Sequence, residues 1–281
     1  MNNFSFNRFS QTLRWVVGVN FRNLMIWTLG YMVGIFLGEQ LFFVFSNGHE
    51  IANVLGNISQ FCTIFILIAL AVGLSTVFYD LNKKTRREAF LMLPVSNLEK
   101  FLAAVVYVTI VWTFFVALSF VAGDMLRMVY RALVNGDEWI SAVPMVLNAI
   151  EPDFLWVFTQ ESTLEYMVMY TVVMCAFIVW MHSLYIFGGT LFRKYSFVAS
   201  SIVLILFMML LAWLTGHYHL TIFTSNWEDD HYVRQEVGVL AYALAVVLPL
   251  LSVFNYWASY RIFKGFQLIT NKWTNYDFYK R

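Results

Sequence analysis

Long apolar runs, separated by short polar segments, predict that the chain crosses a membrane several times. Six runs reach the roughly 20 apolar residues that a helix needs to cross about 30 Å of hydrocarbon. Each span must be helical, because the bilayer core holds no water that could satisfy the open edges of a strand. The predicted spans lie near residues 25–45, 61–81, 101–122, 167–190, 197–215 and 237–259. The pattern therefore predicts an all-α polytopic membrane protein with six transmembrane helices in one domain, residues 25–259.

The chain on either side of this domain is amphipathic. Phe6, Phe9 and Leu13 fall on one helical face, and the neighbouring arginines turn away from it. Residues 1–24 are therefore predicted to form an interfacial helix on the cytoplasmic surface, although the same pattern fits an ordinary extension of the first span. Residues 260–281 are similarly aromatic and basic, so we expect a cytoplasmic tail along the same surface.

The composition excludes a soluble globular domain. Hydrophobic residues make up 60% of the chain and charged residues 12%, whereas about a quarter of the residues are charged in typical soluble domains. Aromatic residues reach 19%, which fits Trp and Tyr side chains at the membrane interfaces. The two cysteines, Cys62 and Cys175, lie in apolar runs and are predicted to be small buried hydrophobic residues. We expect the lipid bilayer as the surrounding medium and no nucleic-acid partner.

Positively charged residues are distributed unevenly between the predicted loops. All but three of the 18 Lys and Arg residues fall on the side that carries the two termini, the exceptions being Arg127, Arg131 and Arg234. Cytoplasmic loops carry an excess of Lys and Arg, so this asymmetry predicts that both termini lie in the cytoplasm.

The long segment after the third predicted span tests this orientation. Residues 139–160 are apolar enough to be considered as a seventh span, but they contain Glu151 and Asp153. A charge at the middle of the bilayer costs about 2.5–3.5 kcal/mol on insertion scales. We therefore expect the outer segment 123–166 to form one or two helices on the membrane surface.

Small and ionisable residues inside the predicted spans are candidates for packing or function. Gly30, Gly34 and Gly38 recur every four residues, which predicts a smooth stripe for close helix packing, either within the chain or as a dimer seam. Glu39 is expected toward the outer leaflet, where snorkelling or a water-filled vestibule would satisfy it. His182 lies in the inner part of the fourth span. Neither has a visible partner in the sequence, and for both we favour structural hydrogen bonding over proton relay.

Motifs for nucleotide binding or catalysis are absent from the sequence. It contains neither a Gly-x-x-x-x-Gly-Lys-Ser/Thr phosphate loop nor a Gly-x-Gly-x-x-Gly fingerprint. No Gly-x-Ser-x-Gly elbow and no paired acid and base indicate a membrane hydrolase. We therefore predict that the chain is not an enzyme and has no catalytic, cofactor-binding or metal-binding residues.

A short basic segment with an apolar, proline-broken end lies between the second and third predicted spans. Its basic residues predict a cytoplasmic loop. An apolar cluster there has neither a membrane nor a core of its own to bury in, so we expect it to dock onto a partner protein. The candidate docking residues are Arg86, Arg87, Glu88, Phe90, Leu91, Leu93, Pro94, Val95 and Ser96. Within this set, Leu91, Leu93 and Val95 are the predicted apolar anchor, and the flanking charges would steer docking.

Taken together, the six spans, the cytoplasmic termini and this loop resemble the membrane-spanning permease subunit of type-2 ABC transporters. Residues 86–102 are similar to the family's E-x-L-L-x-L-P-V-S-R-x-x-x-x-x-K pattern, with Asn97 at the position where a basic residue is common. The long outer segment is a departure, because many such exporters have their additional helices between spans five and six.

The resemblance implies a division of labour between subunits. The loop would form a coupling helix seated on a cytoplasmic ATP-binding subunit, and that partner would bind ATP and Mg. A second permease chain would be needed, giving a homodimer or a heterodimer. The expected function is transport, as an exporter, across the bacterial inner membrane.

Three other readings stay open on the sequence. The chain could be a non-transporting polytopic membrane protein with a regulatory, immunity-type or scaffold role that keeps the docking loop. A membrane enzyme would need an intramembrane acid–base or metal constellation, which the sequence does not show. A secondary transporter would need internal symmetry between its halves, and spans one to three show no convincing repeat in spans four to six.

Overall fold

The computed structural model describes residues 4–45, 51–79, 84–135, 139–150, 163–228 and 231–265. Within these residues, six helices are long and apolar enough to cross a membrane. They are Phe6–Phe45, Val54–Ser75, Asn97–Val134, Leu164–Leu191, Ser196–Tyr218 and Val239–Lys264. The chain is an all-α polytopic membrane protein, as the apolar runs predicted.

The helices belong to two compact units, each described by itself below. Unit 1 comprises residues 1–73 and 94–152, and unit 2 comprises residues 74–93 and 153–281. Unit 1 contains α1 (Phe6–Phe45), most of α2 (Ile51–Ser75), α4 (Asn97–Val106), the π-helix η2 (Tyr107–Val111), α5 (Trp112–Asn135) and α6 (Val143–Ile150). Unit 2 contains α3 (Lys84–Leu91), α8 (Leu164–Leu191), α9 (Ser196–Tyr218), α10 (Val239–Lys264) and the strands β1 (Phe223–Glu228) and β2 (His231–Val237).

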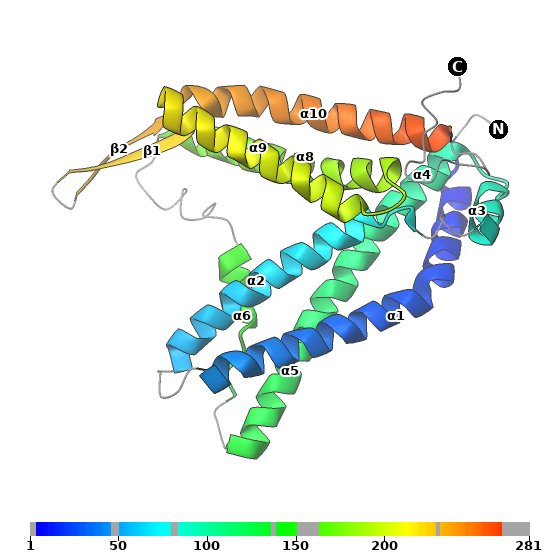
Figure 1. Ribbon diagram of the computed structural model, residues 1–281, viewed down its shortest axis with the longest axis horizontal. Helices are drawn as coiled ribbons and strands as arrows, with labels where there is room; N and C mark the ends of the chain where they lie inside the picture. Colours follow the sequence, from blue (N-terminus) through cyan, green and yellow to red (C-terminus); the bar gives the residue numbers. More distant parts are fainter. Residues whose placement is uncertain are drawn as a thin grey trace. The chain divides into compact units, whose positions relative to one another are not determined.

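The core of unit 1 is built where α1, α2, α5 and α6 meet (Figure 1). Ile35, Ile58, Phe120 and Val146 are almost fully buried there, one from each of these helices. Nearer the start of α5, the indole Nε1 of Trp112 donates a 3.0 Å hydrogen bond to a backbone carbonyl of α2. Apolar burial and one satisfied indole therefore hold α5 against α2.

The structure corrects one span boundary predicted in unit 1. Residues 6–24 belong to α1, which is continuous to Phe45 and changes direction along its length (Figure 1), and their predicted place at the membrane surface stays a prediction. The helix of the third span does not end near residue 122 but continues to Asn135, so no separate surface helix begins at 123. Of the remaining outer segment, α6 packs its Val146 into the core, and residues 151–162 lie outside the described residues.

The described residues of unit 2 form three long helices, the short helix α3 and a hairpin. Helix α8 lies beside α10 and α9 (Figure 1), and the interface contains the buried side chains of Trp180, Leu184, Leu244 and Leu248. Strands β1 and β2 pair in antiparallel register between the fifth and sixth spans. The predicted tail 260–281 begins inside α10, and residues 266–281 lie outside the described residues.

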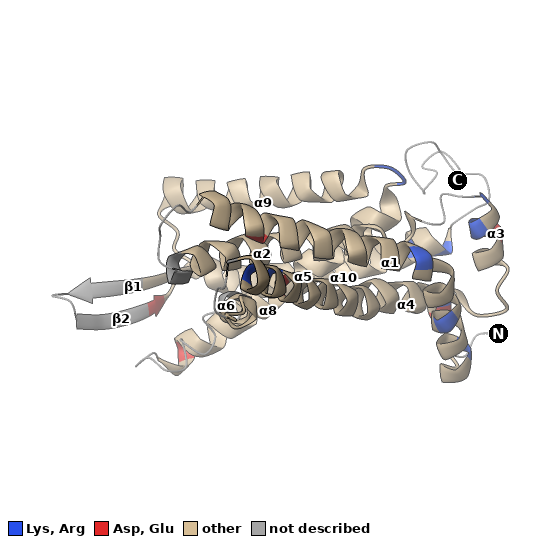
Figure 2. Cartoon of the chain, turned by 90° about the horizontal axis from the view of Figure 1, so that it is seen from below, with Lys and Arg blue, Asp and Glu red and all other residues tan. Residues whose placement is uncertain are grey.

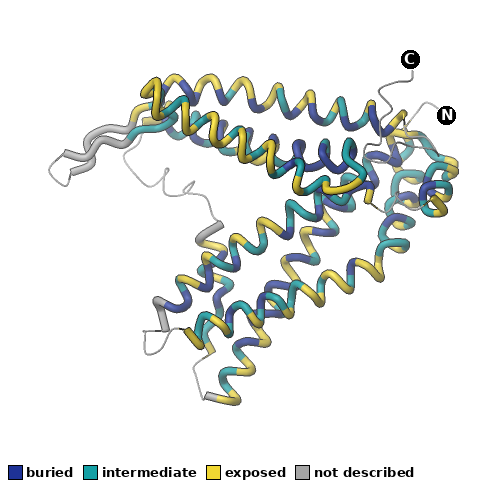
Figure 3. The backbone as a smooth tube through the Cα atoms, viewed as in Figure 1, coloured by how far each residue is buried: buried dark blue, intermediate teal, exposed yellow. Residues whose placement is uncertain are grey.

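The distribution of polarity agrees with a membrane environment. Charged residues gather near the ends of the long helices, whose middle parts are mostly free of them (Figure 2). Helix α9 is exposed along most of its length (Figure 3), although its sequence is apolar on all sides. Such a helix is stable in lipid and not in water. Of the two cysteines expected to be buried, Cys62 is buried and Cys175 is exposed.

Candidate functional site

The predicted docking loop contains a short helix, α3, with one buried face. Arg87 and Phe90 are each 3% exposed. The Phe90 ring lies 6.2 Å from the ring of Phe263, near the end of α10, and Phe263 stacks on Phe78 at 4.9 Å. These aromatic contacts attach α3 to the end of the sixth span, because a buried ring contributes both apolar area and a preferred geometry.

The opposite face of α3 is open. Thr85, Ala89 and Met92 are exposed, and their spacing of four and three residues places them on one side of the helix and its continuation. The Met92 side chain is 78% exposed. A small residue beside a flexible thioether forms an adaptable apolar surface. This face, Thr85–Ala89–Met92, is the candidate docking surface.

The apolar anchor predicted for this loop is partly covered within the chain. Leu91, Leu93 and Val95 are half-buried, whereas Met92 is exposed. The prediction chose alternate residues, as if the segment were extended. Because α3 is helical to Leu91, residues three and four apart share a face instead.

The charges on α3 are arranged around this face. Lys84 and Glu88 form an exposed i,i+4 pair at 4.0 Å, which contributes little to stability. Arg86 is half-buried. Burial, together with the nearby positive charge of Arg193, lowers the pKa of Arg87. Helix α3 therefore carries more positive than negative charge, and one of its arginines, Arg87, is buried.

The end of the loop caps the third span. The Ser96 hydroxyl accepts a hydrogen bond from the Glu99 backbone N–H at 3.3 Å, and a Glu99 carboxylate oxygen accepts one from the Ser96 N–H at 2.8 Å. This reciprocal pair is a capping box. Pro94 and Val95 precede the cap outside regular helix. Ser96, predicted as a docking residue, thus begins the helix Asn97–Val106. The S-x-x-E signal for this role is present in the sequence.

Glu99 also ties the start of the third span to the start of α1. Its carboxylate forms an ion pair with the Arg8 guanidinium at 3.0 Å and accepts a hydrogen bond from the Ser5 N–H at 2.7 Å. Glu99 is fully buried, whereas the Arg8 side chain is 30% exposed. Arg8 is one of the arginines predicted to turn away from the apolar face of this segment. In the structure it links two helices, because a buried carboxylate needs a charged partner.

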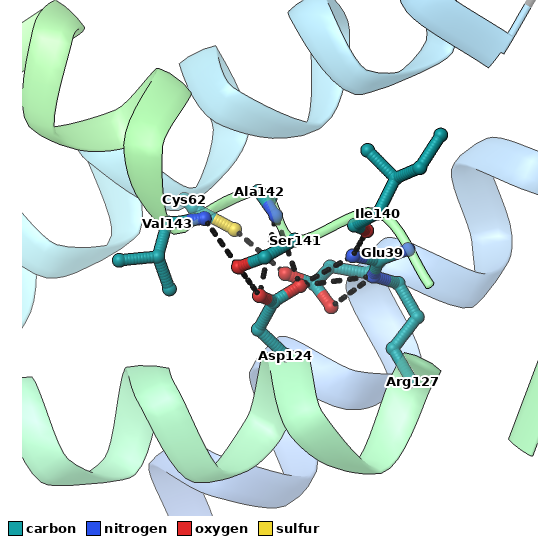
Figure 4. A network of polar contacts seen from close by, with 8 residues as sticks. All are labelled: Glu39, Cys62, Asp124, Arg127, Ile140, Ser141, Ala142 and Val143. Atoms are coloured by element: carbon teal, nitrogen blue, oxygen red, sulfur yellow. Dashed lines mark hydrogen bonds and ion pairs between the residues drawn. The ribbon is translucent and has the colours of Figure 1, made fainter. Parts of the chain in front are cut away.

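A second polar cluster lies near the other end of the third-span helix (Figure 4). The Arg127 Nε donates to Glu39 Oε2 at 3.1 Å and to Asp124 Oδ1 at 3.1 Å. All three side chains are at most 4% exposed. The structural hydrogen bonding favoured for Glu39 is present, and the buried side chain is satisfied by protein groups rather than by snorkelling or a water-filled vestibule. Its partner Arg127 is 88 residues away in the chain, a distance over which sequence pattern carries no signal.

The cluster also holds the segment that precedes α6. Asp124 Oδ2 accepts hydrogen bonds from the Ser141 hydroxyl at 2.6 Å and the Ala142 N–H at 3.2 Å. Arg127 donates to the Ile140 carbonyl at 2.8 Å. From α2, the Cys62 thiol approaches Glu39 Oε1 at 3.4 Å. Three helices and one loop are thereby joined through buried polar groups (Figure 4).

The glycine stripe of α1 serves packing within the chain at two of its three positions. A Cβ atom at Gly38 would overlap the Phe61 ring of α2, and one at Gly34 would lie 3.2 Å from the Phe65 ring. A Cβ atom at Gly30 would meet nothing within 4 Å. Gly34 and Gly38 therefore allow α2 to approach α1 closely.

His182 occupies a polar layer between α8 and α10. Its Nδ1 lies 2.5 Å from the Tyr256 hydroxyl, and the neighbouring Asn255 amide donates to the Ser183 hydroxyl at 3.1 Å. Because Ser183 and Asn255 are buried, these bonds satisfy groups that would otherwise be costly in hydrocarbon. The expected structural hydrogen bond of His182 is thus present.

Among the described residues, no group of three or more His, Cys, Asp and Glu side chains is placed to hold a metal ion. Comparison with protein-family models, curated proteins and solved structures found no match. The structure itself shows a polytopic membrane protein with an open helix face on the loop between the second and third spans and a buried charge cluster in unit 1.

Proposed function

We propose that this chain is the membrane-spanning permease subunit of a type-2 ABC transporter, an exporter of the bacterial inner membrane. The observation that carries the proposal is helix α3, a short basic helix between the second and third spans. It has one face packed against the end of α10 and the opposite face open. A separate cytoplasmic subunit would bind ATP and Mg, and a second permease chain would complete the transporter.

The packing of α3 suits a helix that receives a push. Phe90 contacts Phe263, so displacement of α3 would act directly on the end of the sixth span. An unanchored loop would absorb such a push through its own flexibility, because exposed loops have few buried contacts to resist it. A docked helix with a buried aromatic anchor transmits it instead.

The residues that follow α3 provide a second path by which movement of the loop reaches the spans. The chain reaches the Ser96 cap within five residues of Leu91, and the cap is joined through Glu99 to Arg8. Movement of the loop would therefore pull on the start of the third span and on α1 together. In this proposal, closure of the ATP-binding subunit shifts the population between inward-open and outward-open states through these helices.

The test replaces the open face of α3 by charge. The double variant Ala89→Asp/Met92→Asp changes two exposed side chains, so insertion and folding should be preserved. The matched control is Leu133→Asp, at a residue 81% exposed near the opposite end of the third-span helix. Each tagged variant would be purified from its native cell in mild detergent, the bound proteins identified by mass spectrometry, and ATP turnover measured.

The proposal predicts that an ATP-binding subunit co-purifies with the parent and the control and is lost from the double variant. Retention of the complex and of its ATP turnover in the double variant would contradict the docking surface. A stable complex of the parent chain with an ATP-binding subunit that shows no nucleotide turnover would favour a regulatory or scaffold subunit over a transporter.

A further inference from the structure

The buried cluster of unit 1 contains more negative than positive charge. Two carboxylates, Glu39 and Asp124, contact one guanidinium, that of Arg127. With both acids ionised the formal charge would be −1, at a site where the three side chains are at most 4% exposed. An uncompensated charge in such surroundings is costly, and a buried acid relieves the cost by binding a proton.

The surrounding groups show which acid takes the proton. Asp124 accepts two hydrogen bonds from Arg127, one from the Ser141 hydroxyl and one from the Ala142 N–H. A carboxylate with several donors is held in its ionised form. Asp124 is therefore the acid that pairs with Arg127.

Glu39 has fewer hydrogen-bond donors than Asp124. It receives one N–H from Arg127, which Asp124 shares, and the weak thiol donor of Cys62 at 3.4 Å. The same geometry suits a neutral Glu39 better. Its carbonyl oxygen Oε2 would accept the Arg127 Nε–H, and its Oε1–H would donate to the Cys62 sulfur.

Among the described residues, the titratable groups that interact with Glu39 are Cys62 from α2 and Asp124 and Arg127 from α5, and Ser141 completes the cluster through Asp124. Arg131, one turn beyond Arg127, lies over the Phe43 ring at 3.7 Å. The guanidinium already occupies the position between the two carboxylates, so a metal cation cannot bridge them.

We propose that Glu39 is a proton-binding site and carries a bound proton in the folded protein. While Glu39 holds this proton, the cluster contains one ionised pair, Asp124 with Arg127. This pair holds the segment before α6 through Ser141, Ala142 and Ile140. Loss of the proton would create a second carboxylate that competes with Asp124 for the guanidinium and weakens this hold. The site concerns unit 1 alone and does not depend on the proposed transport function.

Infrared difference spectroscopy tests the proposal on the full chain, purified and reconstituted at neutral pH. A protonated carboxyl group has a carbonyl band distinct from that of a carboxylate, and the band shifts in deuterated water. Exposed Asp and Glu side chains are ionised at this pH and do not contribute to it. The proposal predicts a band that is present in the parent and missing in Glu39→Gln, whose neutral amide matches a protonated carboxyl group in shape.

A second measurement compares thermal unfolding of Glu39→Gln with that of Asp124→Asn. The first variant should unfold within about 2 °C of the parent, and the second should lose about 4 °C or more, because it removes the ionised partner of Arg127. Absence of the infrared band in the parent overturns the proposal. A large loss of stability, or failure to fold, in Glu39→Gln overturns it as well, because a site that already holds a neutral acid must tolerate the amide.

Discussion

Replacing Arg127 by methionine would test the buried cluster most severely. The substitution keeps much of the side-chain volume but removes the guanidinium that contacts Glu39, Asp124 and the Ile140 carbonyl. Breaking a buried ion pair by removing one partner costs about 3–5 kcal/mol, because the remaining charge stays buried and unpaired. One kcal/mol shifts the unfolding midpoint by about 2–4 °C in domains of 150–250 residues. The expected loss is therefore about 6–20 °C.

Thermal unfolding in detergent, followed by intrinsic fluorescence of the 10 tryptophans, measures this loss. Arg131→Met is the matched control, because Arg131 lies one turn away with its guanidinium over the Phe43 ring. A cation–π contact of this kind contributes about 1 kcal/mol, so the control should lose about 2–4 °C. The large expected loss is thus specific to Arg127.

A combined variant separates charge from shape. Removing the buried charges together, in Glu39→Gln/Asp124→Asn/Arg127→Met, should give a protein more stable than Arg127→Met alone, because neutralised partners no longer require a cation. A midpoint for Arg127→Met within about 2 °C of the parent would refute the reasoning, since a buried guanidinium between two acids cannot be removed at so small a cost.

Two further predictions concern helix ends and helix packing. Ser96→Ala removes the hydroxyl that accepts from the Glu99 N–H and should destabilise the protein by about 1 kcal/mol in the same unfolding assay, and an unchanged midpoint would show that the cap contributes nothing. Gly38→Ala should lower the midpoint because the new methyl group overlaps the Phe61 ring, whereas Gly30→Ala meets open space and should be neutral or stabilising by about 0.5–1 kcal/mol. Equal effects of the two glycine substitutions would contradict the described packing of α1 on α2.

The six spans could be predicted because their cause is local. A run of about 20 apolar residues is helical in a bilayer whatever its neighbours are. The error occurred where charged residues interrupt such a run. The predicted end of the third span near residue 122 lies just before Asp124 and Arg127, yet the helix continues to Asn135. The two charges are paired with each other and with Glu39, and this pairing is a property of the folded chain.

In the docking loop, too, the sequence predicted the general character of the segment, and the folded chain decided which side chains are exposed. Its basic residues and its apolar end predicted a partner-facing segment, and the S-x-x-E spacing at Ser96 contained the signal for a helix cap that was not used. Which apolar side chain is open to a partner depends on what covers the others. Phe90 is buried against Phe263, and Met92 is left exposed.

The sequence by itself determined the class of the protein, the number of spans and the position of a basic loop between the second and third spans, because these follow from hydrophobic length and local charge. The tertiary structure alone decided the partners of the ionisable residues: Glu39 with Arg127, Arg8 with Glu99, and His182 with Tyr256. These residues are far apart in the chain. A buried charge or polar group must find its partner wherever the fold places one, and neither hydrophobic periodicity nor residue spacing encodes that position.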